Sequence, residues 1–313
     1  LYQFANCKKI VDDTKECFET EMRRQFLADG GSFEGSSCYH GLVGEMFALA
    51  NLICNHSGSH FLKEYEDRLL KAVDLSEALM MGNEICQIGD NDSGRVICIF
   101  GDDVLNYRLF RTLSRYTVKK EIFDGSDRDL LKIFGCLASD AKVKKHRVLS
   151  SKQIFDRFGV GVIENNGIKV ILCATDAQQF LLGGHTHNDK LSICVSVDNI
   201  AFIVDPGSGC YTENNDIHIR FRSVVSHSTI QYGSFEQNTK QVIGIFGNSY
   251  EAKTCIAESQ NGIAARLEVE NCYQAYRKVT LMEHGVVIND FVTGNSSTII
   301  TERFVLHPEV FVS

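Results

Sequence analysis

The sequence has 313 residues, of which 44% are hydrophobic, and carries a formal net charge of −8 at pH 7. A chain of this length can bury substantial hydrophobic cores, and its length suggests about two domains. The acidic balance argues against nucleic acid as a partner. The sequence contains neither a transmembrane run nor a signal peptide.

The first part of the chain, up to about Ala141, is predicted to be helical. Apolar residues recur at three-and-four spacing in residues 42–50 and again in residues 69–73. This spacing is typical of amphipathic helices that bury one face. We therefore predict a helical domain over residues 1–150.

From about Phe158 the pattern changes to short apolar runs separated by turn residues. Gly159 to Glu164 and Ile168 to Ala174 flank the turn signal Asn165-Asn166-Gly167, which predicts a β-hairpin. A second hairpin is predicted with strands from Leu191 to Val197 and from Ile200 to Val204. Residues 151–313 are therefore predicted to form an antiparallel β domain.

The polar residues around this second hairpin carry the main chemical signal. His185 and His187 precede it, Asp205 follows it, and His227 lies beyond a polar loop. Residues two apart on a strand point to the same side, so the two histidines of the pair could meet one site. Two imidazoles and one carboxylate suit a zinc ion, and the third imidazole would then not be a ligand.

The position of Asp205 depends on the hairpin register. A strict two-residue turn at Asp198-Asn199 pairs Asp205 with Ser192, away from His187. Bringing Asp205 beside His187 requires a bulge, a longer turn or a break near residues 188–190, and the sequence leaves all three open. Four unrelated polar groups are the alternative interpretation. Because the four bracket a single hairpin, we favour a shared site.

Several segments resemble the heparinase II/III-like family of polysaccharide lyases. The family's signature is similar to GHTHNDKLS at 184–192, VDPGSG at 204–209 and RFRSVVSHST at 220–229. Upstream, GSFEGSSCYH at 31–40 is similar to the family's Phe-Glu-x-Ser-x-x-Tyr-His element, and IGDNDSGR at 88–95 resembles a loop of its bacterial members. These matches run in order through most of residues 20–235.

The resemblance implies an α+β fold, with an incomplete (α/α) toroid-type helical domain followed by an antiparallel β-sandwich. It also implies cleavage of a uronic-acid-containing polysaccharide by β-elimination. Tyr39 and His185 correspond to catalytic residues, and His187, Asp205 and His227 correspond to ligands of Zn²⁺.

Two further residues are assigned to substrate binding. Arg222 lies in the family motif, where a guanidinium could pair with a uronate carboxylate or a sulfate, and an ordinary surface ion pair is the alternative. His40 follows Tyr39 and could either orient that side chain or touch sugar. We expect Tyr39 and His185 to face each other across a cleft wide enough for a sugar ring, with Arg222 near its rim.

One element of the family is missing. Its members carry an Asn-His pair on a helix upstream of the Tyr-His element, where the pair helps to neutralise the substrate carboxylate. Here Asn55-His56 follows Tyr39 and is predicted to end a helix. We therefore expect a fragment lacking that element, and a β domain truncated at its end. A non-catalytic glycan-binding or surface-polysaccharide biosynthesis accessory protein is the alternative function.

The net negative charge conflicts with a polyanionic substrate unless positive charge is gathered locally. Lys190, Arg220, Arg222 and the metal could form such a patch, which fits a weakly charged uronan better than a heavily sulfated chain. The pattern Asp90-x-Asp92-x-Gly94 does not satisfy an EF-hand calcium loop, because its glycine falls one position early.

The twelve cysteines form no Cys-x-x-Cys pair. Cys98, Cys173 and Cys194 lie in apolar runs and are predicted to be buried thiols. Unpaired thiols favour a reducing cytoplasm, whereas the family resemblance favours the periplasm or secretion. Oligomeric state is not specified by these features.

Overall fold

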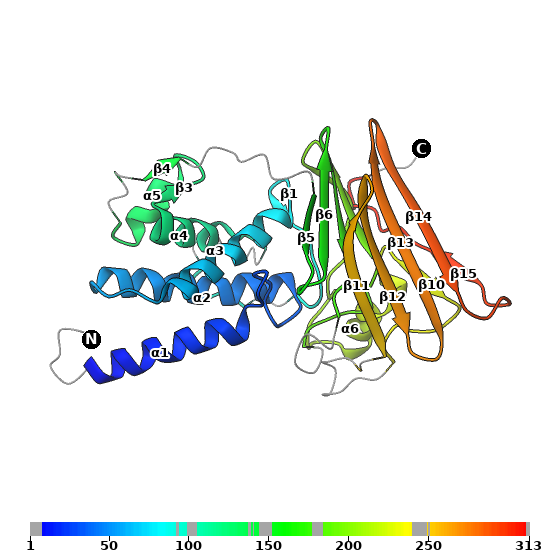
Figure 1. Ribbon diagram of the computed structural model, residues 1–313, viewed down its shortest axis with the longest axis horizontal. Helices are drawn as coiled ribbons and strands as arrows, with labels where there is room; N and C mark the ends of the chain where they lie inside the picture. The colour runs from blue at the N-terminus through cyan, green and yellow to red at the C-terminus, as the bar shows by residue number, and fades with distance from the viewer. Residues whose placement is uncertain are drawn as a thin grey trace.

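The computed structural model describes residues 8–91, 94–98, 105–136, 139, 141–143, 152–176, 184–239, 249 and 251–310. Figure 1 shows a group of helices packed against one side of two stacked β-sheets. These helices, α1 to α5, come from the first part of the chain, and the two stacked sheets come from the second. This arrangement confirms the predicted α+β class with a β-sandwich.

The helical part contains α1 (Lys8–Gln25), α2 (Ser37–His56), α3 (Lys63–Ala78), α4 (Arg108–Lys119) and α5 (Asp127–Ile133). Two short strand pairs accompany them: β1 (Met80–Met81) with β2 (Glu84–Ile85), and β3 (Glu121–Ile122) with β4 (Lys142–Val143). Helices α2 and α3 contain the two predicted amphipathic segments. Helix α2 ends at His56, as predicted from Asn55-His56.

A hydrophobic core holds these helices together. Its fully buried members include Leu69 of α3, Phe110 and Leu113 of α4, and Phe26, which directly follows α1. The ring of Phe47 on α2 packs edge-on against Phe26 with ring centroids 5.5 Å apart. Packing of apolar faces, more than helix propensity, stabilises helices of this length.

Five antiparallel strands form the sheet next to the helices: β5 (Lys152–Phe155), β6 (Val160–Asn165), β7 (Ile168–Cys173), β8 (Ile193–Val197) and β9 (Ile200–Ile203). The predicted hairpin between β6 and β7 is present. Its turn residues Asn166 and Gly167 have positive φ angles of 49° and 77°, which asparagine and glycine tolerate best.

The outer sheet has the strand order β11 (Ala252–Ser259), β12 (Gly262–Val269), β13 (Tyr273–Met282) and β14 (Gly285–Thr293). A separate pair, β10 (Ile230–Tyr232) with β15 (Ile300–Glu302), lies beside it. Val170 and Leu172 of β7 pack into the core between the two sheets, together with Ile263 and Leu267 of β12.

The opposite face of β7 packs against the helical part. Ile171 and Cys173 join a second core that includes Leu75 and Leu79 from the α3 region. Side chains of a strand alternate between its faces, so a strand buried on both faces carries consecutive apolar residues, as Val170 to Cys173 do here. The five-stranded sheet is therefore the middle layer of three.

Polar contacts also connect the helical part to the sheet. The carboxylate of Asp29 accepts hydrogen bonds from the backbone N–H groups of Arg157 and Phe158, both at 2.8 Å. Lys169 Nζ donates to the carbonyl oxygen of Met80 at 2.7 Å. These contacts fix the position of the helices on the sheet.

The predicted domain boundary at residues 150 and 151 lies outside the described residues. Helices α1 to α5 end before it, and β5 begins after it, so the boundary stays a prediction. The closure of the helical part into a toroid also stays a prediction. Among the residues that the structure describes, no helix combines the length and apolar character needed to cross a bilayer.

Candidate active site

The hairpin of β8 and β9 contains a bulge, which is one of the three irregularities expected to change the position of Asp205. Its turn residues Asp198 and Asn199 have φ angles of 50° and 65°, as a two-residue hairpin turn requires. The register then shifts: Ser196 pairs with Ala201, whereas Val195 pairs with Ile203. This bulge changes the face toward which the chain after β9 continues.

The His-x-His segment is a loop, which corrects the expectation that it forms part of a strand. Regular pairing of β8 starts only at Ile193. The backbone of His185 instead bonds to two distant segments: its N–H donates to Glu34 O at 3.1 Å, and its carbonyl accepts from Asp90 N at 2.8 Å. Gly89 has a φ of 69°, and a Cβ there would lie 2.4 Å from His185 O. Only glycine permits this close approach.

The carboxylate of Asp90 lies at the centre of the site. Oδ2 is 3.0 Å from Nδ1 of His185, and Oδ1 is 2.8 Å from Nε2 of His187. Nε2 of His218 is 3.5 Å from the same Oδ1. Burial alone would raise the pKa of Asp90, but the hydrogen bonds from His185 and His187 outweigh it and hold this pKa well below its usual range.

Asp90 also contacts the helix that carries Tyr39. Its carbonyl oxygen accepts a hydrogen bond of 2.6 Å from Ser36 Oγ. Ser36 is the N-cap of α2, and its Oγ accepts from the backbone N–H of Tyr39 at 3.3 Å. The Asp90 segment therefore links Tyr39 in the helical part to the histidines of the β domain.

Tyr39, His185 and Tyr211 form the partly exposed part of the site. The rings of Tyr39 and His185 stack with centroids 3.9 Å apart and an interplanar angle of 7°. The two tyrosine hydroxyl groups are 2.6 Å apart, and Tyr211 Oη is 3.5 Å from His185 Nδ1. On the other side, His185 Nε2 is 3.5 Å from the carboxylate of Glu34, whose pKa is raised by burial.

The stacking of Tyr39 on His185 differs from the expected cleft. Rings in direct contact leave no space for a sugar between their faces. A substrate would have to approach the edges of the rings, where the hydroxyl groups of Tyr39 and Tyr211 meet. Tyr39 and His185 are thus brought together, but side by side in place of opposite one another.

His187 and His227 are fully buried, and their ring centroids are 5.4 Å apart. Each ring has a carboxylate at one nitrogen: Asp90 at Nε2 of His187, and Asp205 at Nδ1 of His227 at 2.7 Å. Within the described part of the chain, Nδ1 of His187 and Nε2 of His227 have no hydrogen-bond partner. Buried nitrogens without a partner are unusual and require an explanation.

The pKa values of these two rings shift in opposite directions. Burial lowers the pKa of His187 below its ordinary value, because the bond to Asp90 compensates only in part. Burial would also lower that of His227, but the negative charge of Asp205 outweighs it and raises this pKa. Asp205 is held in turn by the N–H of Gly207, which donates to Oδ1 at 3.0 Å.

The three predicted metal ligands do not form a preassembled ligand group. The described residues contain no set of three or more His, Cys, Asp or Glu side chains arranged to hold a metal ion. His187 and His227 lie together, whereas the carboxylate of Asp205 is engaged with His227 Nδ1.

Burial revises the two substrate-binding assignments. His40 is fully buried in the helical core, where Nε2 lies 3.0 Å from both Ala72 O and Ser76 Oγ. Burial lowers the pKa of His40 to about 4. His40 therefore packs beneath Tyr39 and does not reach sugar. Arg222 is 5% exposed, and its guanidinium donates to Thr186 O at 3.0 Å, so it supports the histidine loop from inside.

Other expectations for the region around the site are also corrected. The predicted loop before His227 contains a helix, α6 (Asn215–Arg222), which is capped by the side chain of Asn214. Lys190 is fully buried and contacts His187 O and Asp189, so it cannot belong to a surface patch. Cys98 is exposed, whereas Cys173 and Cys194 are buried as predicted. Asp92 lies outside the described residues.

Asp90 and Tyr211 are the site residues that sequence reasoning missed. Asp90 lies in the segment 88–95, which resembles a loop of the family, but its residue pattern alone indicates no contact with the histidines. Tyr211 lies six residues after Asp205, in the loop that continues the VDPGSG motif. Both positions were therefore marked by motifs, although the residue types alone did not reveal their contacts.

Comparison with known proteins identifies the family. The sequence profile described as "Heparinase II/III-like, C-terminal" matches residues 149–313, which is more than half of the chain. The chain belongs to this heparinase II/III-like family. No curated protein matches the sequence significantly.

Solved structures of lyases share the fold. A heparinase III structure superimposes with a TM-score of 0.70 at 17% identity, covering 97% of this chain and 46% of that protein. A second heparinase III gene product gives a TM-score of 0.68 at 16% identity, with 96% and 44% covered. The heparan sulfate lyase HepC from Pedobacter heparinus gives 0.58 at 15% identity, with 89% and 43% covered. The chain thus spans less than half the length of these proteins.

Proposed function

We propose that this chain is the catalytic part of a polysaccharide lyase that cleaves a uronic-acid-containing glycan by β-elimination. The observation that carries the proposal is the cluster of Tyr39, Tyr211 and His185 at the junction of the helical part and the β domain. Family membership and the shared fold agree with it, although a fold alone does not establish an activity.

The reaction needs a base and an acid beside the same sugar. Removal of the C5 proton leaves an electron pair that forms the C4–C5 double bond, while the bond from C4 to the glycosidic oxygen breaks and that oxygen takes a proton. A tyrosine hydroxyl and an imidazole can both transfer protons. Tyr39 and His185 lie within a few ångströms of each other, and Tyr211 extends the hydrogen-bonded chain to a second hydroxyl.

Asp90 positions this chemistry. Its carboxylate lies at Nδ1 of His185 and so fixes the orientation of the ring that stacks on Tyr39. A carboxylate that holds a histidine in one orientation commonly affects activity without touching substrate. Glu34 lies near the other ring nitrogen and contributes a second negative charge at the site.

We also propose a zinc ion held by His187 and His227. The two unpartnered ring nitrogens supply lone pairs, and each ring is oriented by a carboxylate at its other nitrogen, the usual support for a metal-binding histidine. Two imidazoles on one tetrahedral zinc, with bonds of 2.0 to 2.1 Å, have ring centroids about 5 Å apart. The observed 5.4 Å agrees with that value.

In this proposal Asp205 either completes the ligand set, as the family resemblance implies, or orients His227 as its contact here suggests. When bound, zinc would fix the geometry of the segments that carry His187 and His227. The acid–base steps remain with Tyr39 and His185.

The test is eliminative turnover by the full-length protein on a panel of uronate polysaccharides, followed by ultraviolet absorbance of unsaturated ends. Tyr39→Phe removes only a hydroxyl, so turnover should fall by about two to four orders of magnitude while glycan binding and folding are retained. Tyr276→Phe, on the β13 strand of the outer sheet, is the matched control and should leave turnover unchanged. Undiminished turnover in Tyr39→Phe would remove Tyr39 from the mechanism.

The same experiment separates the lyase from the alternative function. Binding of a uronan without any turnover by the wild-type protein would favour a non-catalytic glycan-binding or biosynthetic accessory protein. One feature supports this alternative. Tyr39 stacks directly on His185 and leaves no gap for a sugar between the rings.

A further inference from the structure

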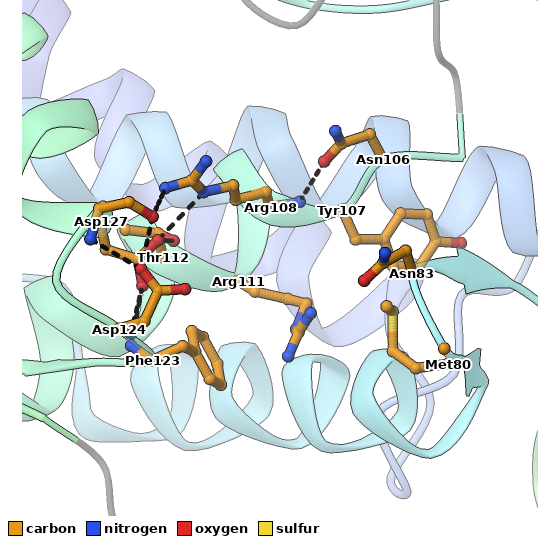
Figure 2. Close-up of a pocket in the computed structure, with 12 residues that line it drawn as sticks. Met80, Asn83, Asn106, Tyr107, Arg108, Arg111, Thr112, Phe123, Asp124 and Asp127 are labelled. Carbon is orange, nitrogen blue, oxygen red and sulfur yellow. Dashed lines mark hydrogen bonds and ion pairs between the residues drawn. The ribbon is translucent and has the colours of Figure 1, made fainter. Parts of the chain in front are cut away.

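A pocket of about 550 Å³ lies in the helical part, away from the histidine cluster. Figure 2 shows it between the turn that joins β1 to β2, the start of α4, and the segment from β3 to α5. Its volume is within the range of small-molecule sites, roughly 300 to 1,000 Å³. Its lining includes the guanidinium groups of Arg108 and Arg111, the amides of Asn83 and Asn106, and the ring of Phe123.

The charged groups of this pocket are not equally satisfied. Asp127 is buried and receives hydrogen bonds from Arg108 Nε at 3.2 Å, Thr112 Oγ1 at 3.0 Å and the backbone N–H of Phe123 at 2.8 Å. Asp124 accepts from the backbone N–H of Ser126 at 2.7 Å. Both carboxylates of the lining therefore have donors, and Arg108 has its counter-charge.

Arg111 differs from its neighbour Arg108. Its Nε is buried without a hydrogen-bond partner, and among the described residues no carboxylate forms an ion pair with it. The nearby Glu77 is paired with Arg115 at 3.2 Å. Burial lowers the pKa of Arg111, and the negative charges of Glu77 and Asp127, which form no ion pair with it, offset this only in part. A partly buried cation without a partner is unfavourable unless something supplies the opposite charge.

The orientation of Arg111 is fixed before any ligand arrives. Its guanidinium carbon lies 4.3 Å from the centroid of the Phe123 ring, a cation–π contact. Figure 2 shows this guanidinium between Phe123 and Met80, with Asn83 and Asn106 on the Met80 side of the pocket. A planar guanidinium in a fixed position is suited to bidentate recognition of an oxyanion.

We infer that this pocket binds an oxyanion carried on a sugar-sized molecule, with Arg111 as the anion-binding residue and Asn83 and Asn106 as hydrogen-bonding partners for hydroxyl groups. A uronate monosaccharide has this chemistry, because it combines one carboxylate with several hydroxyl groups. The inference does not depend on the lyase mechanism, since no residue of the pocket belongs to the histidine site.

The test measures binding of glucuronate to the full-length protein by isothermal titration calorimetry, with glucose as the uncharged probe and inorganic sulfate as the free anion. Arg111→Gln should weaken glucuronate binding at least 10-fold, whereas Arg111→Lys should weaken it less because the charge remains. Arg24→Gln, which removes an exposed positive charge on α1, is the matched control and should bind like wild type. Tyr39→Phe should also retain this binding.

A second variant covers the case in which Arg111→Gln does not fold. Asn83 is exposed, so Asn83→Asp should fold and should weaken glucuronate binding several-fold by repulsion. Arg111-dependent binding of sulfate that equals that of glucuronate would support the anion site and assign it to free oxyanions. Glucuronate binding that is absent from wild type, or unchanged in both pocket variants, would overturn the inference. Either result leaves the lyase test unaffected.

Discussion

Asp90 illustrates at the scale of single residues why part of the site could be predicted and part could not. His185 and His187 are two residues apart, so the sequence pattern alone indicated that they share a site. Their common partner Asp90 is 95 and 97 positions away along the chain. No local periodicity connects residues at that separation, and only the packing of the helical part on the sheet brings them together.

Burial is the second reason for error at this scale. His40 and Arg222 belong to motifs that resemble substrate-binding elements, and motif resemblance does not report exposure. His40 follows Tyr39 on α2, so consecutive side chains point about 100° apart and only one of them faces the site. Lys190 was assigned to a surface patch on charge alone, yet its ammonium group is satisfied inside the loop by His187 O and Asp189.

The burial of His40 predicts a specific acid sensitivity. Its pKa is about 4 in the folded chain, against an ordinary value of 6.5. Above pH 6.5 the His40 side chain is neutral in both the folded and the unfolded chain, so it does not lower the free energy of unfolding. As the pH falls from 6.5 to 4, the unfolded chain takes up a proton that the folded chain excludes. Stability should therefore fall by up to about 3 kcal/mol from this group.

His40→Gln keeps a side-chain N–H donor for Ala72 O but cannot titrate. The free energy of unfolding in urea, measured at pH 7 and pH 4.5, should decrease less in the variant than in the wild type. His284→Gln, at an exposed position, is the control and should follow wild type. An equal loss in wild type and His40→Gln would contradict the assignment.

At the scale of elements, the turn residues predicted both hairpins correctly. The structure of the His-x-His segment and of α6 was not predicted. The β6–β7 and β8–β9 hairpins form at the predicted Asn-Gly and Asp-Asn turns, because these residues accept positive φ angles. The His-x-His segment lacks strand pairing, since its backbone bonds to residues 34 and 90. Helix α6 has 8 residues, too few for a clear periodicity.

Arg277 on β13 connects the outer sheet to the site. It is fully buried, and its guanidinium donates to Asp290 at 2.6 and 2.9 Å, to Leu191 O at 2.7 Å and to Ser228 O at 3.0 Å. Leu191 and Ser228 lie close in sequence to His187 and His227. The outer sheet therefore holds both histidine-bearing segments through one side chain.

Arg277→Leu should destabilise the protein by about 3–5 kcal/mol, because it removes the cation that pairs with the buried Asp290 carboxylate and the hydrogen bonds to the carbonyl groups of Leu191 and Ser228. Arg266→Leu on the neighbouring strand β12 is the control. Its ion pair with Glu268 is half exposed, at 52% and 50%, so the loss should be about 0–1 kcal/mol. Urea unfolding of both variants provides the measurement. Equal effects of the two substitutions would show that the buried contacts do not stabilise the sheet.

At the scale of the whole molecule, the three-layer arrangement explains which predictions succeeded. The change from three-and-four spacing to short alternating runs agrees with helices α1 to α5 in the first part and strands β5 to β15 in the second, but it did not indicate α6 or the short strands β1 to β4. Val170 to Cys173 of β7 are all apolar because that strand is covered on both faces, and periodicity alone cannot distinguish such a run from a buried helix.

The proposed zinc should stabilise the whole molecule. A ligand that binds only the folded state at 1,000 times its Kd adds about 4 kcal/mol, so chelation should lower the melting temperature. His187→Ala should abolish zinc binding, and added zinc should not restore stability. Asp205→Asn should retain zinc with affinity reduced about 10- to 100-fold if Asp205 only orients His227.

Metal content by mass spectrometry and thermal unfolding of the three proteins would check this prediction. His284→Ala, which removes an exposed imidazole between β13 and β14, is the control. Wild-type protein that contains no zinc after dialysis against the free metal, with a melting temperature insensitive to chelator, would exclude the zinc proposal.

The position of Asp90 has a consequence for how the protein gains and loses its reactive geometry. Asp90 and Tyr39 belong to the helical part, whereas His185 and His187 belong to the β domain, and each part has a hydrophobic core of its own. The proposed active site therefore draws on both parts, which a further core containing Leu79 and Ile171 joins. Separation of the helices from the sheet would take Asp90 and Tyr39 away from the two histidines even if each part kept its own core.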